Sequence, residues 1–310
     1  MKYILLISAS FLLTACSFSR TDSILLAESA SPSDSFSSTQ NASPWLVIDN
    51  FETGKLDDWH LADTQNDTNP FVEKAQVTEI RLHDTNANIN TTTSPTLPMV
   101  NNGYLIKKPA PDGIVGNRKA LSFKALPVPV KIGDTYTFYT RIRVERFPNN
   151  HAFGISNLPP NEILAQGYNA FEPTLRVTDK YESNGYKNDG SLMVKIDSTD
   201  KYRQYASVKN ADNKASEPLT VGEWYEIWYV VNNATVENGG QKYSVYVKGG
   251  EFSQQTLAYE NANFRMKREL PLIYFLANSN TGPIDKPYGN GGLAYDDIYM
   301  SEGVNLSTPY

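Results

Sequence analysis

Apolar and polar residues alternate along many short segments of this chain. Segments such as TYTFYTRIRVERF (135–147), KYSVYVKGG (242–250) and LAYDDIYM (293–300) place every second side chain on the same side of an extended backbone. About fourteen such segments lie between residues 45 and 300, and turn-forming pairs such as Asn149-Asn150 and Gly249-Gly250 separate them. No helical periodicity persists for three turns, so the pattern predicts an all-β chain without a helix.

The arrangement of these segments predicts a single folded domain over residues 44–304. Composition does not change along this stretch, and no fixed sequence period is present, which argues against a propeller. The expected architecture is therefore a two-sheet antiparallel jelly-roll sandwich. Residues 84–102 lack strand signals and are expected to form a long loop.

The N-terminal residues have the pattern of a targeting signal. Lys2 precedes YILLISASFLL, an apolar run too short to span a bilayer, and LLTAC follows. This resembles the signal of bacterial lipoproteins and predicts a signal peptide over residues 1–15 and lipidation of Cys16. The alternative is an ordinary secretory signal with a chance cysteine. Ser17, where Asp would favour retention in the inner membrane, is typical of outer-membrane sorting.

Residues on either side of the predicted domain differ from it in composition. Residues 16–43 are rich in Ser, Thr, Asp, Asn and Ala, which predicts a flexible tether after the anchor, and residues 305–310 are expected to be a short tail. The expected location is the outer membrane, at its periplasmic face or at the cell surface. A net charge of −6 gives no indication of nucleic-acid binding.

Several segments resemble the concanavalin A-like lectin/glucanase superfamily, which includes laminin-G-like domains. LTVGEWYEIWYVVNN (219–233) is similar to a strand of that fold with a Gly-x-Trp entry, and QKYSVYVKGG (241–250) is similar to the hairpin partner that follows it. IDNFETGKLDDW (48–59) and AYDDIYM (294–300) resemble the ends of calcium-bearing carbohydrate-binding modules. The resemblance implies a jelly roll whose first and last strands are neighbours, but fold similarity does not fix function.

The resemblance also implies a structural Ca²⁺ between the first and last strands, where oxygen ligands would surround it. Glu52 and Asp296 are the expected carboxylate ligands. Strand alternation places Asp296 on the face of Ile298 and Met300, which is expected to be the core face, and Asp297 on the other. The alternative is that Asp296 accepts backbone hydrogen bonds or pairs with a Lys or Arg.

Two classes of carbohydrate-active enzyme are relevant to this fold. Laminarinase-type glycosidases need an E-x-D-x-x-E strand, which does not occur here. YVKGGEFSQ (246–254) is similar to the YFKAGVYNQ motif of one alginate-lyase family, but Phe252 replaces the catalytic tyrosine. If the protein is a polysaccharide lyase, the candidate catalytic residues are His151, Arg141 and Arg143.

Arginines and tyrosines on the predicted strands are the main polar feature. Arg141 and Arg143 share one face of segment 135–147, and TLRV (174–177) adds Arg176. If these strands belong to one concave sheet, they form a basic groove in which guanidinium groups bind carboxylates or sulfates and tyrosines stack on sugars. The alternative is a solvated sheet face with Arg–Glu pairs. The candidate ligand-binding residues are Tyr139, Arg141, Arg143, Asn150, His151, Arg176, Tyr186 and Lys248.

The sequence therefore favours an outer-membrane lipoprotein that binds a polysaccharide, most simply an anionic one. A polysaccharide lyase acting on uronate polymers such as alginate is the alternative. The third hypothesis is an envelope lipoprotein that binds other proteins.

Overall fold

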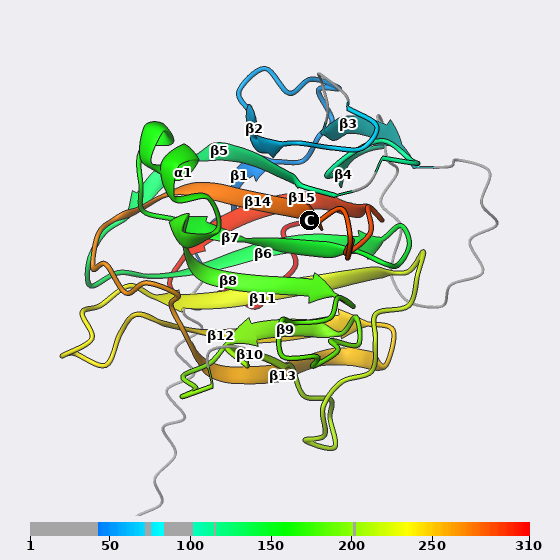
Figure 1. Ribbon diagram of the computed structural model, residues 1–310. Helices are drawn as coiled ribbons and strands as arrows, with labels where there is room; N and C mark the ends of the chain where they lie inside the picture. The colour runs from blue at the N-terminus through cyan, green and yellow to red at the C-terminus, as the bar shows by residue number, and fades with distance from the viewer. Residues whose placement is uncertain (1–42, 72–75, 84–101, 115, 201–202) are drawn as a thin grey trace, which may run out of the picture. The chain divides into compact units, whose positions relative to one another are not determined.

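The computed structural model describes residues 43–71, 76–83, 102–114, 116–200 and 203–310, and residues 41–310 form one compact unit. The predicted signal peptide, Cys16 and almost all of the predicted tether lie outside the described residues, as does almost all of the predicted loop 84–102. The described residues form two antiparallel sheets (Figure 1), which confirms the prediction of a two-sheet all-β sandwich.

The larger sheet, called sheet A, contains the first and last strands of the described chain. Its order is β13-β12-β11-β6-β15-β4-β3, and β1 pairs with β15. The strands are β1 (Leu46–Asp49), β3 (Val77–Leu82), β4 (Gly103–Lys108), β6 (Thr135–Val144), β11 (Trp224–Asn232), β12 (Lys242–Gly249), β13 (Phe252–Asn263) and β15 (Leu293–Glu302).

The smaller sheet, called sheet B, has the order β10-β9-β8-β7-β14-β5-β2. Its strands are β2 (His60–Asn66), β5 (Arg118–Val130), β7 (Asn150–Ser156), β8 (Phe171–Thr178), β9 (Leu192–Lys195), β10 (Tyr205–Ser207) and β14 (Leu272–Gly282). Successive strands often lie in different sheets, so residues far apart in sequence become neighbours on each face.

The core lies between the two sheets and contains the side chains that strand alternation turns inward. Phe138, Ile142 and Val144 of β6 are buried in it, together with Leu175 and Val177 of β8. The alternation expected for these two strands is therefore confirmed. Each sheet consequently has one buried face and one outer face, and the outer faces carry the polar side chains discussed below.

A short helix that the sequence analysis missed covers part of the outer face of sheet B. Helix α1 (Pro160–Gln166) continues into the 3₁₀ helix η1 (Gly167–Ala170). Pro160 at the first helical position and Gly167 at the C-cap are ordinary helix-boundary signals, but fewer than three turns separate them. Among the described residues, no helix has the length and apolar character needed to cross a membrane.

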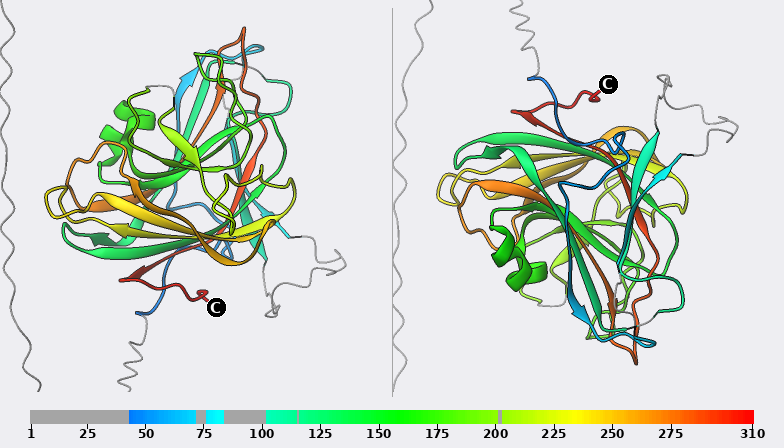
Figure 2. Two further views of the ribbon diagram at one scale, coloured as in Figure 1. Left: turned by 90° about the horizontal axis from the view of Figure 1, so that it is seen from below. Right: turned by 90° about the horizontal axis from the view of Figure 1, so that it is seen from above.

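The last residues of the chain, 303–310, lie across the outer face of sheet A and are called the C-terminal tail. Trp228 Nε1 donates a hydrogen bond to the carbonyl of Ser307 (2.8 Å), and Gln255 Nε2 donates to that of Leu306 (2.9 Å). The side-chain amide of Asn305 donates to the carbonyl of Ser43 (2.9 Å). The views of Figure 2 show the tail and helix α1 on opposite sides of the sandwich.

Candidate functional site

The structure separates the arginines that the sequence analysis grouped. Arg141 and Arg143 lie on the outer face of sheet A, because their neighbours Ile142 and Val144 face the core. Arg176 lies on the outer face of sheet B for the same reason, since Leu175 and Val177 face the core. The expectation of one groove that contains all three arginines is therefore wrong, because β6 and β8 belong to different sheets.

Arg141 is already paired within the protein. Its guanidinium bonds to Asp296 through Nη2 and lies 2.9 Å from Asp297 through Nε, and only 17% of its side chain is exposed. His83 Nε2 also donates to Asp296, at 3.0 Å. Burial raises the pKa of Asp297, and the adjacent charge of Asp296 adds to this, whereas Arg141 opposes it. The alternative in which Asp296 pairs with an arginine is thus the one that the structure supports.

A β-bulge explains how two adjacent aspartates reach the same arginine. Asp296 lies opposite Arg141 and Tyr299 lies opposite Tyr139, so two residues of β15 face Thr140. Asp297 has a φ of 51°, which the extra residue imposes on the backbone. The prediction that Asp296 shares a face with Ile298 and Met300 is therefore wrong, because strand alternation restarts after the bulge.

The other predicted ligand-binding residues on sheet A are also in contact with side chains of the protein itself. Tyr139 is fully buried, and its hydroxyl bonds to Glu226 (3.2 Å) and to Tyr310 of the C-terminal tail (3.0 Å). Lys248 donates to Glu226 at 2.9 Å. The Arg143 guanidinium lies against the rings of both Tyr104 and Trp224, at 4.7 and 4.8 Å from their centroids. The predicted binding residues of sheet A therefore have their partners within the protein.

The described residues lack the cluster of donor side chains that the calcium prediction requires. No group of three or more His, Cys, Asp or Glu side chains there could hold a metal ion. Burial raises the pKa of Glu52, and so does the charge of nearby Asp296, which shows that the two predicted ligands are neighbours. However, Asp296 is bonded to Arg141 and His83, and a cation would have to displace them.

His151 is placed for a structural role. It is 1% exposed and lies on the same side of β7 as Phe153 and Ile155, which face the core. Its Nε2 donates to the carbonyl of Gly291 at 2.8 Å. Burial lowers its pKa to about 4, so the ring is neutral at physiological pH. The structure therefore does not bring His151, Arg141 and Arg143 together as a lyase would require.

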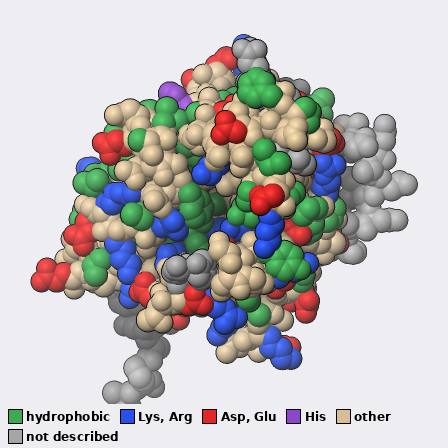
Figure 3. Space-filling view, in the orientation of Figure 1, with side chains coloured by type: hydrophobic (Ala, Val, Ile, Leu, Met, Phe, Trp, Pro, Cys, Tyr) green, Lys and Arg blue, Asp and Glu red, His purple; other side chains and the backbone are tan. Residues whose placement is uncertain are grey.

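A groove crosses the outer face of sheet B. Its volume is about 590 Å³, within the range of ligand sites in proteins. Figure 3 looks onto this face and shows a hollow near its middle with basic side chains around it. Residues of α1 and η1, from Leu164 to Asn169, form one wall, and Lys180, Glu182 and Tyr288 contribute to the opposite one.

The floor of the groove is a row of outward side chains on three neighbouring strands. Asn278 of β14 lies opposite Ala152 of β7, which lies opposite Arg176 of β8. Ala152 is small, and this leaves a hollow between the amide and the guanidinium. Asn278 is 7% exposed, and its Oδ1 has no hydrogen-bond partner among the described residues. Asn150 of β7, which the sequence analysis named as a ligand-binding candidate, also faces outward and lines the groove.

Arg176 is buried yet only weakly paired. Its side chain is 10% exposed, and its one hydrogen bond to the described residues runs from Nη2 to Glu182 Oε1 at 3.5 Å. The guanidinium lies 4.6 Å from the ring centroid of Tyr205. A guanidinium has five N–H donors in a planar fork, so most of those of Arg176 are available to an anion in the groove.

Further cations and aromatic rings line the walls. Arg265 lies over the ring of Tyr168 at 4.2 Å and donates to Asn169 Oδ1 at 2.8 Å. Lys180 lies 4.6 Å from the ring centroid of Tyr288. Burial lowers the pKa of Lys180, and Arg176 lowers it further, whereas Glu182, at 2.9 Å, raises it. Together with Lys119 these cations outnumber Glu182, the acidic side chain that lines the groove.

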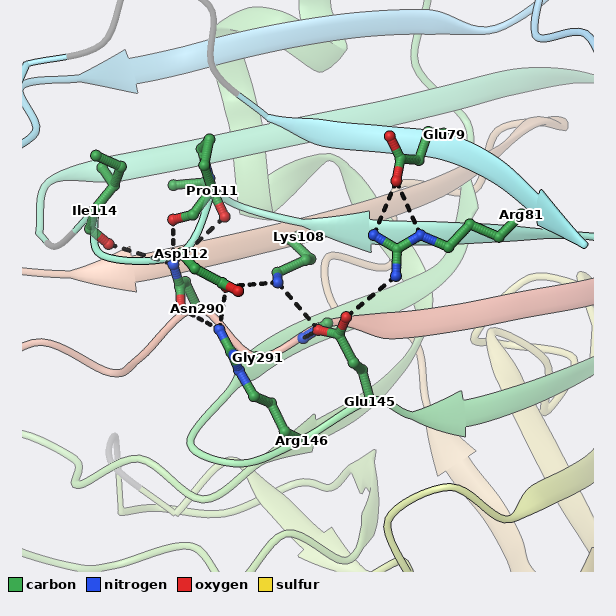
Figure 4. Close-up of polar contacts among 12 residues, drawn as sticks. Glu79, Arg81, Lys108, Pro111, Asp112, Ile114, Glu145, Arg146, Asn290 and Gly291 are labelled. Atoms are coloured by element: carbon green, nitrogen blue, oxygen red, sulfur yellow. Dashed lines mark hydrogen bonds and ion pairs between the residues drawn. The ribbon is translucent and has the colours of Figure 1, made fainter.

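A polar network fixes the loop that carries Tyr288. Asn290 Nδ2 donates to the carbonyl of Pro111 (2.6 Å), and its Oδ1 accepts from Arg146 (3.2 Å), as Figure 4 shows. Lys108 lies between Asp112 (2.7 Å) and Glu145 (3.2 Å) in the same network. This wall of the groove is therefore held in place by contacts within the protein.

Most of the groove residues were not singled out from the sequence. In LIYFLANSNTG, Asn278 and Asn280 stand at outward positions of a mainly apolar strand, which is a signal that could have found them. Tyr186, a predicted ligand residue, is 41% exposed and lies under Arg203 at 4.6 Å. It does not line the groove. The groove residues that the sequence analysis missed as ligand candidates include Lys119, Tyr168, Lys180, Tyr205, Arg265 and Asn278.

No family model matches this chain, and no curated protein matches its sequence. Solved structures with a similar course of the chain include basic winged bean lectin with Tn-antigen, which is 14% identical, covers 84% of this chain and 98% of the lectin, and has a TM-score of 0.46. The exoplasmic/lumenal domain of VIP36 in its Ca²⁺/Man3GlcNAc-bound form is 8% identical, with coverages of 85% and 90% and a TM-score of 0.42. A mutant of alginate lyase Aly36B with alginate tetrasaccharide is 12% identical, with coverages of 66% and 82% and a TM-score of 0.38. The ligands named here are those of the similar proteins.

Proposed function

We propose that this protein binds an anionic polysaccharide in the groove on sheet B. The observation that carries the proposal is Arg176, a guanidinium at the groove floor whose only carboxylate partner among the described residues, Glu182, is 3.5 Å away. A buried charge is stable only when it is paired and hydrogen-bonded, so this position favours an additional anion. A uronate carboxylate or a sugar sulfate presents two or more oxygens that such a fork can bind at once.

The other lining residues fit the remaining parts of such a ligand. Tyr168, Tyr205 and Tyr288 offer ring faces and edges to the apolar sides of sugar rings. Asn150 and Asn278 offer amides to hydroxyl groups. The cationic lining stands in a protein with a net charge of −6, so the attraction for an acidic chain is local to the groove.

The proposal is tested by comparing one polymer in two charge states. Affinity electrophoresis and calorimetry would measure binding to alginate, pectin-type and ulvan-type polysaccharides and to the same polymers after reduction of their carboxyl groups. We expect retardation by at least one acidic polymer, weaker binding at high salt because screening reduces the attraction, and loss of binding after reduction. The absence of binding to every acidic polymer would refute the proposal.

A polysaccharide lyase is the second candidate, and one observation favours it. Lys180 lies beside the ring of Tyr288 on one wall of the groove, and Arg176 lies on the groove floor. Burial lowers the pKa of Lys180. Such groups can move protons while an arginine neutralises a uronate carboxylate. Ultraviolet absorbance of the unsaturated product separates the two candidates, since a binding protein produces none.

We also propose that the chain is an outer-membrane lipoprotein anchored through Cys16, which the LLTAC sequence and Ser17 support. Metabolic labelling with palmitate, followed by membrane fractionation of wild type and Cys16→Ala, tests this part. Labelling that is equal in both proteins would contradict it.

A further inference from the structure

The groove extends across almost the whole width of sheet B. Its lining residues come from six of the seven strands, and β9 is the one that contributes none. Thr64 lies at the β2 end and Tyr205 at the β10 end. Neighbouring strands are about 4.8 Å apart, so these two ends are separated by about 29 Å, the sum of six strand spacings. The groove thus crosses the strands of the sheet.

The depth of the groove changes along this line. In the middle, Ala152, Arg176 and Asn278 are all less than 10% exposed. Thr64 and Lys119 at one end are exposed, and Gln204 and Tyr205 at the other are half-buried. A ligand that fills the deep middle can therefore continue past it towards solvent on both sides.

The cations form two groups along the same line. Arg176 and Arg265 belong to one group, because both guanidinium groups contact the rings or hydroxyl groups of Tyr168 and Tyr205. Lys119 on β5 is three strands from Arg176 on β8, which corresponds to about 14 Å across the sheet. Lys119 and the arginine pair therefore cannot meet one carboxylate, so they fit a ligand with repeated charges along a linear chain.

We propose that the groove holds an internal segment of a linear polyanionic polysaccharide, with Arg176 and Arg265 binding the charge of one unit and Lys119 binding the charge of a unit further along the chain. This inference rests on the proposed function and specifies its ligand: a chain that passes through the groove rather than a chain end that stops in it. Affinity then depends on oligomer length until both the arginine pair and Lys119 are reached.

The test is a calorimetric titration with size-fractionated oligouronates of the acidic polymer that binds best. For the wild type, affinity should rise with length and then level off, and blocking either chain end by reduction or labelling should leave the affinity of long oligomers unchanged. In Lys119→Ala, long oligomers should lose roughly threefold in affinity, the size expected for one exposed charge pair, whereas the shortest oligomers that bind should be unaffected.

Lys209→Ala is the matched control, because Lys209 is also an exposed lysine but does not line the groove. Affinity that is independent of length, or that is abolished by blocking a chain end, would overturn this inference while leaving the proposed function intact. An equal effect of Lys119→Ala on short and long oligomers would also overturn it. Failure of every acidic oligomer and polymer to bind would instead refute the proposed function itself.

Discussion

The two outer faces of the sandwich each carry a mostly buried arginine, but the two arginines have different surroundings. On sheet A, Arg141 bonds to both Asp296 and Asp297, and the C-terminal tail lies over the neighbouring Tyr139. On sheet B, Arg176 has one carboxylate contact within the described part of the chain, at 3.5 Å, and lines an open groove. The side-chain exposures, 17% for Arg141 and 10% for Arg176, do not distinguish them.

The difference shows that residue type and burial are insufficient to identify a binding arginine. What separates the two faces is the number of donors that the protein itself uses. A paired guanidinium holds its own sheet together, whereas one with available N–H groups can bind a ligand. We therefore expect the arginine of sheet A to contribute to stability and, under the proposed function, that of sheet B to contribute to ligand binding.

The largest effect should come from breaking the pair on sheet A. Asp296→Ala leaves Arg141 buried with only Asp297 as a carboxylate partner, so we expect the free energy of unfolding to fall by about 3 kcal/mol, at the lower end of values for a broken buried pair. Urea denaturation measures this loss. Asp285→Ala, which removes an exposed carboxylate, is the control. A loss similar to that of the control would mean that Arg141 does not depend on its partner.

The corresponding change on sheet B should affect binding. Arg176→Ala removes a charge-assisted contact worth about 1.5–3 kcal/mol, so we expect the affinity for the acidic polysaccharide to fall roughly 10- to 100-fold. Arg143→Ala removes an arginine from sheet A and should leave affinity unchanged. Calorimetry measures the affinity of both variants. Equal losses of affinity would contradict the assignment of binding to sheet B alone.

A smaller effect concerns the core between the faces. His151 has a pKa of about 4 when folded, below the ordinary value of 6.5, because burial disfavours the charged ring. The unfolded chain therefore binds more protons between these values, and stability falls as pH decreases, by on the order of 1 kcal/mol between pH 7 and pH 5.5. In His151→Gln this part of the slope should disappear in urea titrations at several pH values, whereas His60→Gln, at an exposed histidine, should retain it.

Calcium should have the smallest effect. Asp296 is already bonded to Arg141 and His83, so we expect the same Tm in EDTA and in excess CaCl₂ by differential scanning calorimetry. A calcium-dependent rise in Tm that Asp296→Asn removes would show that sheet A holds a metal ion after all.

The sequence was sufficient to predict the fold class and the core faces of single strands, because alternation is a local property. It correctly placed Arg141 and Arg143 opposite Ile142 and Val144. It failed at Asp296, because one extra residue in β15 reverses the alternation. The residues YDDIYM contain no signal that predicts a bulge. It also failed to assign Arg176 to a sheet, since strand order is set by contacts between distant segments.

The groove was harder to predict for the same reason. Its floor comes from β14, β7 and β8, which are neighbours in space but not in sequence. Its walls come from a helix too short for a periodicity test and from a loop fixed by Asn290. Single outward residues such as Asn278 could be recognised in the sequence, but their convergence could not.

The hydrogen bonds that join Ser43 to Ser301 and Asn305 attach the start of the described domain to β15 and to the C-terminal tail. If the chain is anchored through Cys16 and the groove holds a polymer, as proposed above, force from the anchor reaches sheet A at this point and the polymer pulls on sheet B. The two points of load then lie on different sheets, so we expect resistance to pulling to depend on the packing of the core between them.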